Sequence, residues 1–278
     1  MEFHFSRLNV HIPMVLPIVM PMAMILLGEG FLFVGNFDAC IILHLLNILV
    51  CVMVPLLMRE NPIIWQCFSL VSMLRVLNLG MPKFTTMTLE WIPLIYAPVI
   101  VVAFLLIRDE SLGFKDYVVK MRSFVSLSKE RSGWKLYHLP LGLAFALLLA
   151  NIEFNVLSMT IPDLRMISDM SLENLAFLFV VMVFFVGLGE ELVFRYLLQT
   201  RVQGTLGVLG AIAVSSIMFA VMHSGYQSLP YLIYVFVVAL FLGVSFYRTK
   251  SLAYVTLIHG ALNFFLFSFL PFGYLRLF

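Results

Sequence analysis

Glu190 and Glu191 are adjacent carboxylates inside an apolar run of the sequence, and Arg195 follows in the same run. An ionisable side chain at mid-bilayer is unfavourable by roughly 2.5–3.5 kcal/mol, so such groups should face a protein interior or a water-filled cavity. On a helix, Glu191 and Arg195 are four residues apart and can pair, whereas Glu190 points about 100° away around the axis. We therefore expect Glu191 to be neutralised by Arg195 and Glu190 to be left free for chemistry.

Two later apolar runs carry histidines that could act together with Glu190. His223 stands one helical turn after Phe219, so both side chains lie on one face. His259 and Asn263 have the same spacing in the last apolar run. We predict that Glu190, His223 and the pair His259 and Asn263 meet around one cavity.

These four side chains match the needs of peptide hydrolysis. The reaction requires a nucleophilic water, a base for its proton, an acid for the leaving amine and donors for the developing oxyanion. One carboxylate, two imidazoles and one carboxamide supply that set. The same groups could instead hold zinc, with Glu190, His223 and His259 as ligands and Asn263 as a weak one. The residues by themselves leave both possibilities open.

The composition is that of a membrane protein. Of the 278 residues, 62% are hydrophobic and only 12% are charged, and the mean hydropathy is +1.05. The apolar runs are continuous, whereas an outer-membrane barrel shows alternating segments of roughly 10 residues. We predict an all-α polytopic integral membrane helical bundle. The net charge of +2 gives no support for a nucleic-acid partner.

The apolar runs predict eight or nine transmembrane helices. Their ranges are about 10–34, 37–58, 62–80, 89–107, 137–157, 172–199, 206–224, 229–247 and 252–272. The third run contains Arg75 and Asn78. The first contains Pro13, Pro17 and Pro21, which bend or interrupt a helix. The count depends mainly on these two runs.

Basic residues set the predicted orientation, because cytoplasmic loops are rich in Lys and Arg. Many of the 17 basic residues lie in one loop: Arg108, Lys115, Lys120, Arg122, Lys129, Arg131 and Lys135. We place this loop in the cytoplasm, with the active site facing the same side and the acidic 158–173 loop outside. In a prokaryote the protein would lie in the cytoplasmic membrane.

The same loop divides the chain. Residues 1–107 are predicted to form accessory N-terminal transmembrane helices, and 136–278 a catalytic transmembrane core. Residues 108–135 form a basic cytoplasmic loop or an interfacial helix. No cleavage site follows the first apolar run, so we interpret it as an uncleaved span.

The other polar groups in apolar runs are interpreted as structural. Side chains of this kind usually form hydrogen bonds between helices or lie near the interface. We assign that role to Glu29, His44, Asn47, Arg75 with Asn78, and Glu153. The three cysteines have no metal-ligand spacing and are interpreted as small core residues: Cys40, Cys51 and Cys67.

In order along the chain, the motifs resemble those of a known family. They are Glu190-Glu191-x-x-x-Arg195, Phe219-x-x-x-His223 and His259-x-x-x-Asn263. This set is similar to that of the CPBP family, which comprises CAAX-type prenyl endopeptidases and bacteriocin-processing or self-immunity proteins. The resemblance covers about residues 170–270.

The resemblance implies an intramembrane endopeptidase in which Glu190 and His223 activate water and His259 and Asn263 complete the site. Glu191, Arg195 and Phe219 would support it. The partners implied are membrane lipid and a membrane-associated protein or peptide substrate, of which a prenylated CAAX protein is one possibility. The family is described both as zinc-dependent and as metal-free with an oxyanion hole. We favour the metal-free account, because an amide is a poor zinc ligand and a good oxyanion donor.

Two other functions are compatible with the residues. A non-catalytic membrane immunity or scaffold protein would retain the polar cluster for packing. A proton-coupled transporter would use Glu190, Glu191 and His223 as a relay. The sequence has no clear internal repeat, which argues against a transporter built from duplicated halves. It assigns neither an oligomeric state nor a substrate.

The depth of the site raises one difficulty. At about 1.5 Å per residue, Glu190 is about 15 Å from the helix end near Thr200, but His223 is nearer to about 25 Å from Leu206. Groups of one site must share a level. We therefore expect the glycine segment 204–210 to lie along the surface, with the helix starting later, or the helix to tilt strongly.

Overall fold

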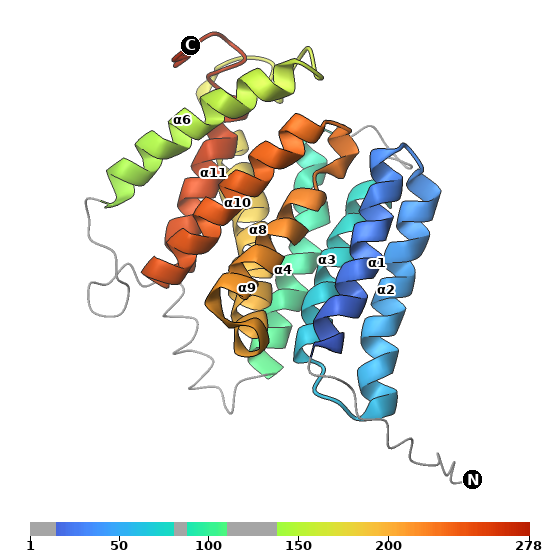
Figure 1. Ribbon diagram of the computed structural model, residues 1–278. Coiled ribbons are helices and arrows are strands. Elements are labelled where there is room, and N and C mark those ends of the chain that lie inside the picture. The colour runs from blue at the N-terminus through green and yellow to red at the C-terminus, as the bar shows by residue number, and fades with distance from the viewer. Residues whose placement is uncertain (1–14, 81–87, 110–137) are drawn as a thin grey trace.

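A computed structural model describes residues 15–80, 88–109 and 138–278, and these form an all-helical bundle without strands (Figure 1). Within these described ranges, seven helices are long and apolar enough to cross a membrane, and Leu252–Phe267 is a shorter apolar helix. The predicted polytopic helical membrane protein is confirmed. The predicted basic loop or interfacial helix lies almost wholly outside the described residues.

Four helices make up the N-terminal part of the bundle. They are α1 (Leu16–Phe33), α2 (Phe37–Met58), α3 (Ile63–Gly80) and α4 (Ile92–Asp109), which follows the short 3-10 helix η2 (Leu89–Trp91). Helix α1 packs on α2 and α3, and α3 packs on α4 (Figure 1). Both runs on which the predicted count depended are helical. Pro17 is accommodated in the first turn of α1. Backbone N–H groups there have no acceptor within the helix, so the N–H that proline lacks is not needed.

The C-terminal part begins with α6 (His138–Ser158), which packs against α11 and α10. The next helical arm is continuous and consists of α7 (Leu172–Val180), η3 (Val181–Gly187), α8 (Leu188–Glu191) and η4 (Leu192–Gln199). It leads into α9 (Thr200–Val221), the 3-10 helix η5 (Ser224–Tyr226), α10 (Leu229–Thr249) and α11 (Leu252–Phe267). Serine side chains cap α7, α10 and α11 at their N-termini: Ser171, Ser228 and Ser251.

A bend at Gly207 folds the helical stretch Leu172–Tyr226 back on itself. Gly207 has a φ of 69°, in a region that favours glycine, and its backbone is not helical. Across the bend, Ser215 Oγ donates a hydrogen bond of 2.7 Å to the carbonyl of Phe194. The ring centroids of Phe194 and Phe219 are 5.2 Å apart. The two arms therefore run antiparallel.

This bend explains how Glu190 and His223 can lie at the same depth in the membrane. Glu190 precedes Gly207 by about as many residues as His223 follows it. At about 1.5 Å per residue, both lie about 25 Å from the bend and can share one level. The predicted later start is found in part: the helix resumes directly after Gly207, inside the segment 204–210 rather than beyond it.

Candidate active site

All four predicted catalytic residues line one cavity of about 430 Å³: Glu190, His223, His259 and Asn263. They come from α8, from the segment that follows α9, and from α11. Helices of the N-terminal part also contribute to the wall, through Arg75, Asn78 and Tyr96. The two parts of the chain therefore enclose the cavity together.

Glu190 and Glu191 lie between two turns of π-helix, η3 and η4. Such turns frequently occur at functional sites. Glu191 and Arg195 are both 0% exposed, and Arg195 Nε lies 3.2 Å from Glu191 Oε2. The ion pair expected from their spacing is thus present, behind the cavity wall.

Glu191 also holds His259. Nδ1 of His259 lies 2.8 Å from Glu191 Oε1, and Nε2 lies 3.7 Å from Glu190 Oε2. A carboxylate accepts hydrogen bonds, so the proton on Nδ1 is donated to Glu191. One glutamate therefore orients the imidazole, and the other faces its remaining nitrogen.

Glycines allow α11 to approach closely enough for these contacts. A Cβ on Gly260 would lie only 2.7 Å from the Cα of Val183, and one on Gly187 would lie 3.0 Å from the carbonyl oxygen of Thr256. Small residues of this kind permit close packing of membrane helices. Gly260 directly follows His259, so the close approach sets the position of that histidine.

His223 lies directly beyond the C-terminal end of α9. Its Nδ1 is 3.0 Å from the carbonyl oxygen of Phe219, which can only accept, so in the neutral ring Nε2 is left as an acceptor. The Phe219 ring lies 5.2 Å from the His223 ring and 5.6 Å from the His259 ring. The guanidinium carbon of Arg195 is 4.4 Å from the Phe219 centroid. Phe219 thus packs between both histidines and the buried cation.

Tyr96 is a site residue that the sequence analysis missed. Its hydroxyl donates a hydrogen bond of 2.5 Å to Glu190 Oε1. Little in the sequence indicated this role, because tyrosine is common in apolar helices. The one available indication was its hydroxyl, which usually needs a hydrogen-bond partner when it is buried. Glu153, which was assigned structural hydrogen bonds, lines the cavity and accepts one of 2.8 Å from Tyr231.

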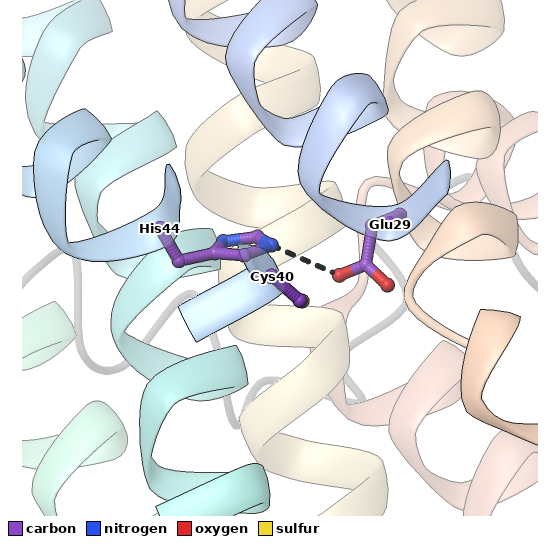
Figure 2. Close-up of side chains that lie close together, drawn as sticks. All are labelled: Glu29, Cys40 and His44. Carbon is purple, nitrogen blue, oxygen red and sulfur yellow. Dashed lines mark ion pairs between the residues drawn. The ribbon is translucent and has the colours of Figure 1, made fainter. Parts of the chain in front are cut away.

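The site fits zinc in donor type but not in spacing. A metal-binding histidine typically donates its other ring nitrogen to a carboxylate or carbonyl, as His223 and His259 do here. Among the described residues, however, the group whose ligand atoms lie within 4.8 Å of one another is Glu29, Cys40 and His44 (Figure 2). Glu190, His223 and His259 would have to move closer together to hold an ion.

Residues 172–265 match the model of a family described as Type II CAAX prenyl endopeptidase Rce1-like. The matched stretch runs from the first residue of α7 into α11 and contains all four predicted catalytic residues. It confirms the family predicted from the motifs. Comparison with curated proteins and with solved structures found no match.

Proposed function

We propose a mechanism for this CAAX-type intramembrane protease in which Glu190 and His223 activate a water molecule and His259 and Asn263 bind the developing oxyanion. One observation carries the proposal: these four side chains, from three separate segments, line a single cavity. Two contacts of the surrounding groups support it. Glu191 holds His259, and a backbone carbonyl holds His223.

In the first step, water attacks the carbonyl carbon of the scissile peptide bond. Its proton passes to Glu190, while Nε2 of His223 accepts the second hydrogen bond of the water and orients it. The oxyanion that forms is bound by the amide N–H of Asn263 and by Nε2–H of a doubly protonated His259. With that proton, His259 and Arg195 together balance the charges of Glu190 and Glu191.

In the second step, the oxyanion re-forms the carbonyl and the C–N bond breaks. Glu190 returns its proton to the leaving amine nitrogen, so the carboxylate is regenerated. The products are a new carboxyl terminus and a released amine. No group of the protein is consumed.

The proposed substrate is a membrane-associated protein or peptide cut near the membrane, and a prenylated CAAX terminus is the form that the family description suggests. The cavity has the mixed lining that such a substrate needs. Aromatic and aliphatic side chains surround the few polar groups, among them Phe194, Val235, Val238 and Phe267. We propose that the site faces the cytoplasm, with lipid as the other partner.

Cleavage of a quenched fluorescent CAAX peptide, with and without a prenyl group, by the purified protein tests the mechanism. Glu190→Gln and His223→Ala should each reduce kcat at least about 100-fold, within the range for loss of a base. Glu153→Gln is the matched control, because it changes another buried carboxylate of the same cavity. Full activity of Glu190→Gln would refute the proposal. Variants that lose only stability would favour a scaffold.

Metal dependence has a separate readout. If the site works without metal, protein with no bound zinc by elemental analysis should retain its activity in the presence of a chelator. Loss of activity that zinc restores would instead assign Glu190, His223 and His259 as ligands, with zinc polarising the carbonyl or the water.

A further inference from the structure

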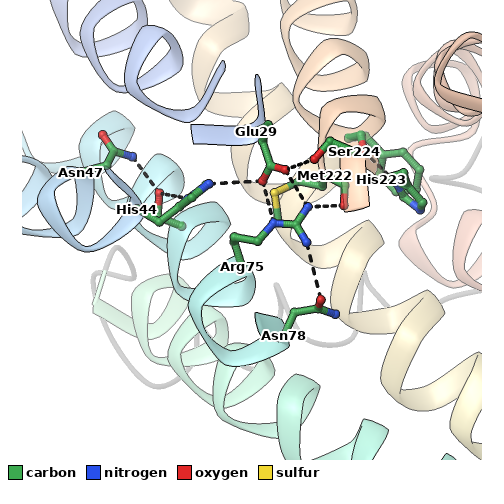
Figure 3. A network of polar contacts seen from close by, with 10 residues as sticks. Glu29, His44, Asn47, Arg75, Asn78, Met222, His223 and Ser224 are labelled. Carbon is green, nitrogen blue, oxygen red and sulfur yellow. Dashed lines mark hydrogen bonds and ion pairs between the residues drawn. The ribbon is translucent and has the colours of Figure 1, made fainter. Parts of the chain in front are cut away.

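A buried ion pair from the N-terminal helices lies against the segment that carries His223. Arg75 of α3 donates from Nε to Glu29 Oε1 across 2.6 Å and from Nη2 to Oε2 across 2.8 Å. Glu29 belongs to α1, and the two residues are 2% and 3% exposed. This is a bidentate arginine–carboxylate ion pair, which is a strong form of charge-assisted hydrogen bonding (Figure 3).

Each member of the pair binds one sequence neighbour of His223. Arg75 Nη2 donates to the carbonyl oxygen of Met222, the residue before it. Ser224 Oγ, of the residue after it, donates to Glu29 Oε2 across 2.5 Å. Figure 3 shows both contacts converging on the histidine segment. His223 is therefore held from both sides by one ion pair.

These contacts supply what the end of α9 lacks. The last carbonyls of a helix have no partner within it, and a buried one needs another donor. The positive charge of Arg75 also interacts favourably with the negative end of the helix dipole. Beyond α9, η5 starts a new turn at Ser224. Without Glu29 and Arg75, the short connection carrying His223 would lose the hydrogen bonds at Met222 and Ser224. The contact of His223 with the carbonyl of Phe219, in its own helix, would remain.

Glu29 also belongs to a second group of side chains, which is poorly suited to bind a metal ion. Glu29, Cys40 and His44 bring their ligand atoms close together (Figure 2). Both oxygens of Glu29 already accept hydrogen bonds from Arg75, whose charge would repel a metal cation. His44 Nε2 lies 3.2 Å from Glu29 Oε1, and its Nδ1 lies 3.0 Å from Ser72 Oγ. Through His44, the ion-pair network of Glu29 and Arg75 therefore extends into α2.

We infer that the Glu29–Arg75 pair is a positioning element for His223, fixing the depth and rotation of its imidazole relative to Glu190. The inference rests on the proposed function, because it assigns His223 a role in activating water. It gives the N-terminal helices α1 and α3 a part in the reaction without contact with the reacting atoms.

Ser224→Ala tests the inference with little risk to folding, because it removes one hydroxyl. Ser72→Ala is the matched control, since Ser72 is a buried serine of the same network that bonds His44 and Asn47 rather than the His223 segment. Measured per folded molecule in the full-length protein, Ser224→Ala should lower kcat about 5- to 10-fold with KM unchanged. Ser72→Ala should leave kcat unchanged, and Ser224→Thr, which keeps the hydroxyl, should restore most of it.

A second variant removes the pair as a whole. Glu29→Met combined with Arg75→Met avoids a single unpaired buried charge, which would destabilise the fold. Its kcat should fall by at least about 10-fold with the folded fraction maintained. If this variant does not fold, Ser224→Ala decides.

Two results would overturn the positioning role. One is a Ser224→Ala variant whose kcat per folded molecule equals that of the wild type, and the other is an equal loss in Ser72→Ala. These results are distinct from failure of the proposed function. A fully active His223→Ala counts against the proposed function, whereas an inactive His223→Ala with a normal Ser224→Ala counts against the positioning role alone.

Discussion

The hydroxyl of Tyr96 donates a hydrogen bond to Oε1 of Glu190, joining α4 to α8 across 2.5 Å. The other oxygen of Glu190, Oε2, lies 3.7 Å from His259 Nε2. The two oxygens of this carboxylate therefore have different surroundings. One is fixed by a neutral donor, and the other faces the histidine and the cavity, where a water molecule would be bound.

Tyr96→Phe removes that donor while filling the same space. A hydrogen bond to a charged group is worth about 1.5–3 kcal/mol, so we expect kcat to fall by roughly 10- to 100-fold if the bond is needed to aim Glu190. The measurement is steady-state peptide cleavage. Tyr234→Phe is the control, because Tyr234 lines the same cavity and donates to the carbonyl of Leu149 instead. Equal effects of both substitutions would contradict the prediction.

Glu190 and Glu191 should respond differently to truncation. Glu191→Ala leaves Arg195, which is fully buried, without its partner, and such a change destabilises proteins by about 3–5 kcal/mol. Glu190→Ala removes no ion-pair partner of Arg195 and should destabilise much less. Thermal unfolding in detergent compares the two. Glu191→Leu with Arg195→Met should recover part of the loss, and equal unfolding temperatures of the two single variants would count against this view.

Asn263→Ala should affect catalysis far more than folding. Its side chain lines the cavity, and the proposed mechanism uses its amide as an oxyanion donor. Loss of one such donor lowers kcat by about 100- to 1,000-fold in well-studied proteases. We expect a fall of that size with little change in KM. A variant with normal kcat would exclude Asn263 from the oxyanion site.

Gly260→Ala tests the close approach of α11. The added methyl group would overlap Val183, so α11 has to shift and His259 moves with it. Overpacking of this kind destabilises by about 1–3 kcal/mol. We expect a lower unfolding temperature together with reduced kcat. Gly204→Ala is the control, because a Cβ there meets nothing within 4 Å; it should leave both quantities close to those of the wild type.

The sequence was sufficient to predict the helical class and four of the residues that line the cavity: Glu190, His223, His259 and Asn263. Length and continuity of the apolar runs determine the fold class, because a bilayer permits few structures. Glu190, His223 and His259 stand out because each is unfavourable in lipid unless it faces a polar space. The pairing of Glu191 with Arg195 follows from their spacing alone.

Contacts between helices could not be predicted in this way. Spacing determines which residues share a face of one helix, but it does not say which helices meet. Arg75 is 46 residues from Glu29 and 147 from Met222, and no local pattern connects them. Tyr96 is likewise far from Glu190 in the chain. Glu191 also accepts a hydrogen bond from His259, in addition to its ion pair with Arg195. This bond depends on how α11 packs, which the sequence does not give.

The bend at Gly207 restricts how this part of the chain can change in length. One residue inserted into a single arm would move its polar group by about 1.5 Å and rotate it by about 100°. Glu190 and His223 would then no longer face the same space. Insertions and deletions can be accommodated at the bend itself, or as equal changes of whole helical turns in both arms. Homologous chains should therefore differ in length at the bend, or by the same number of whole turns in the two arms.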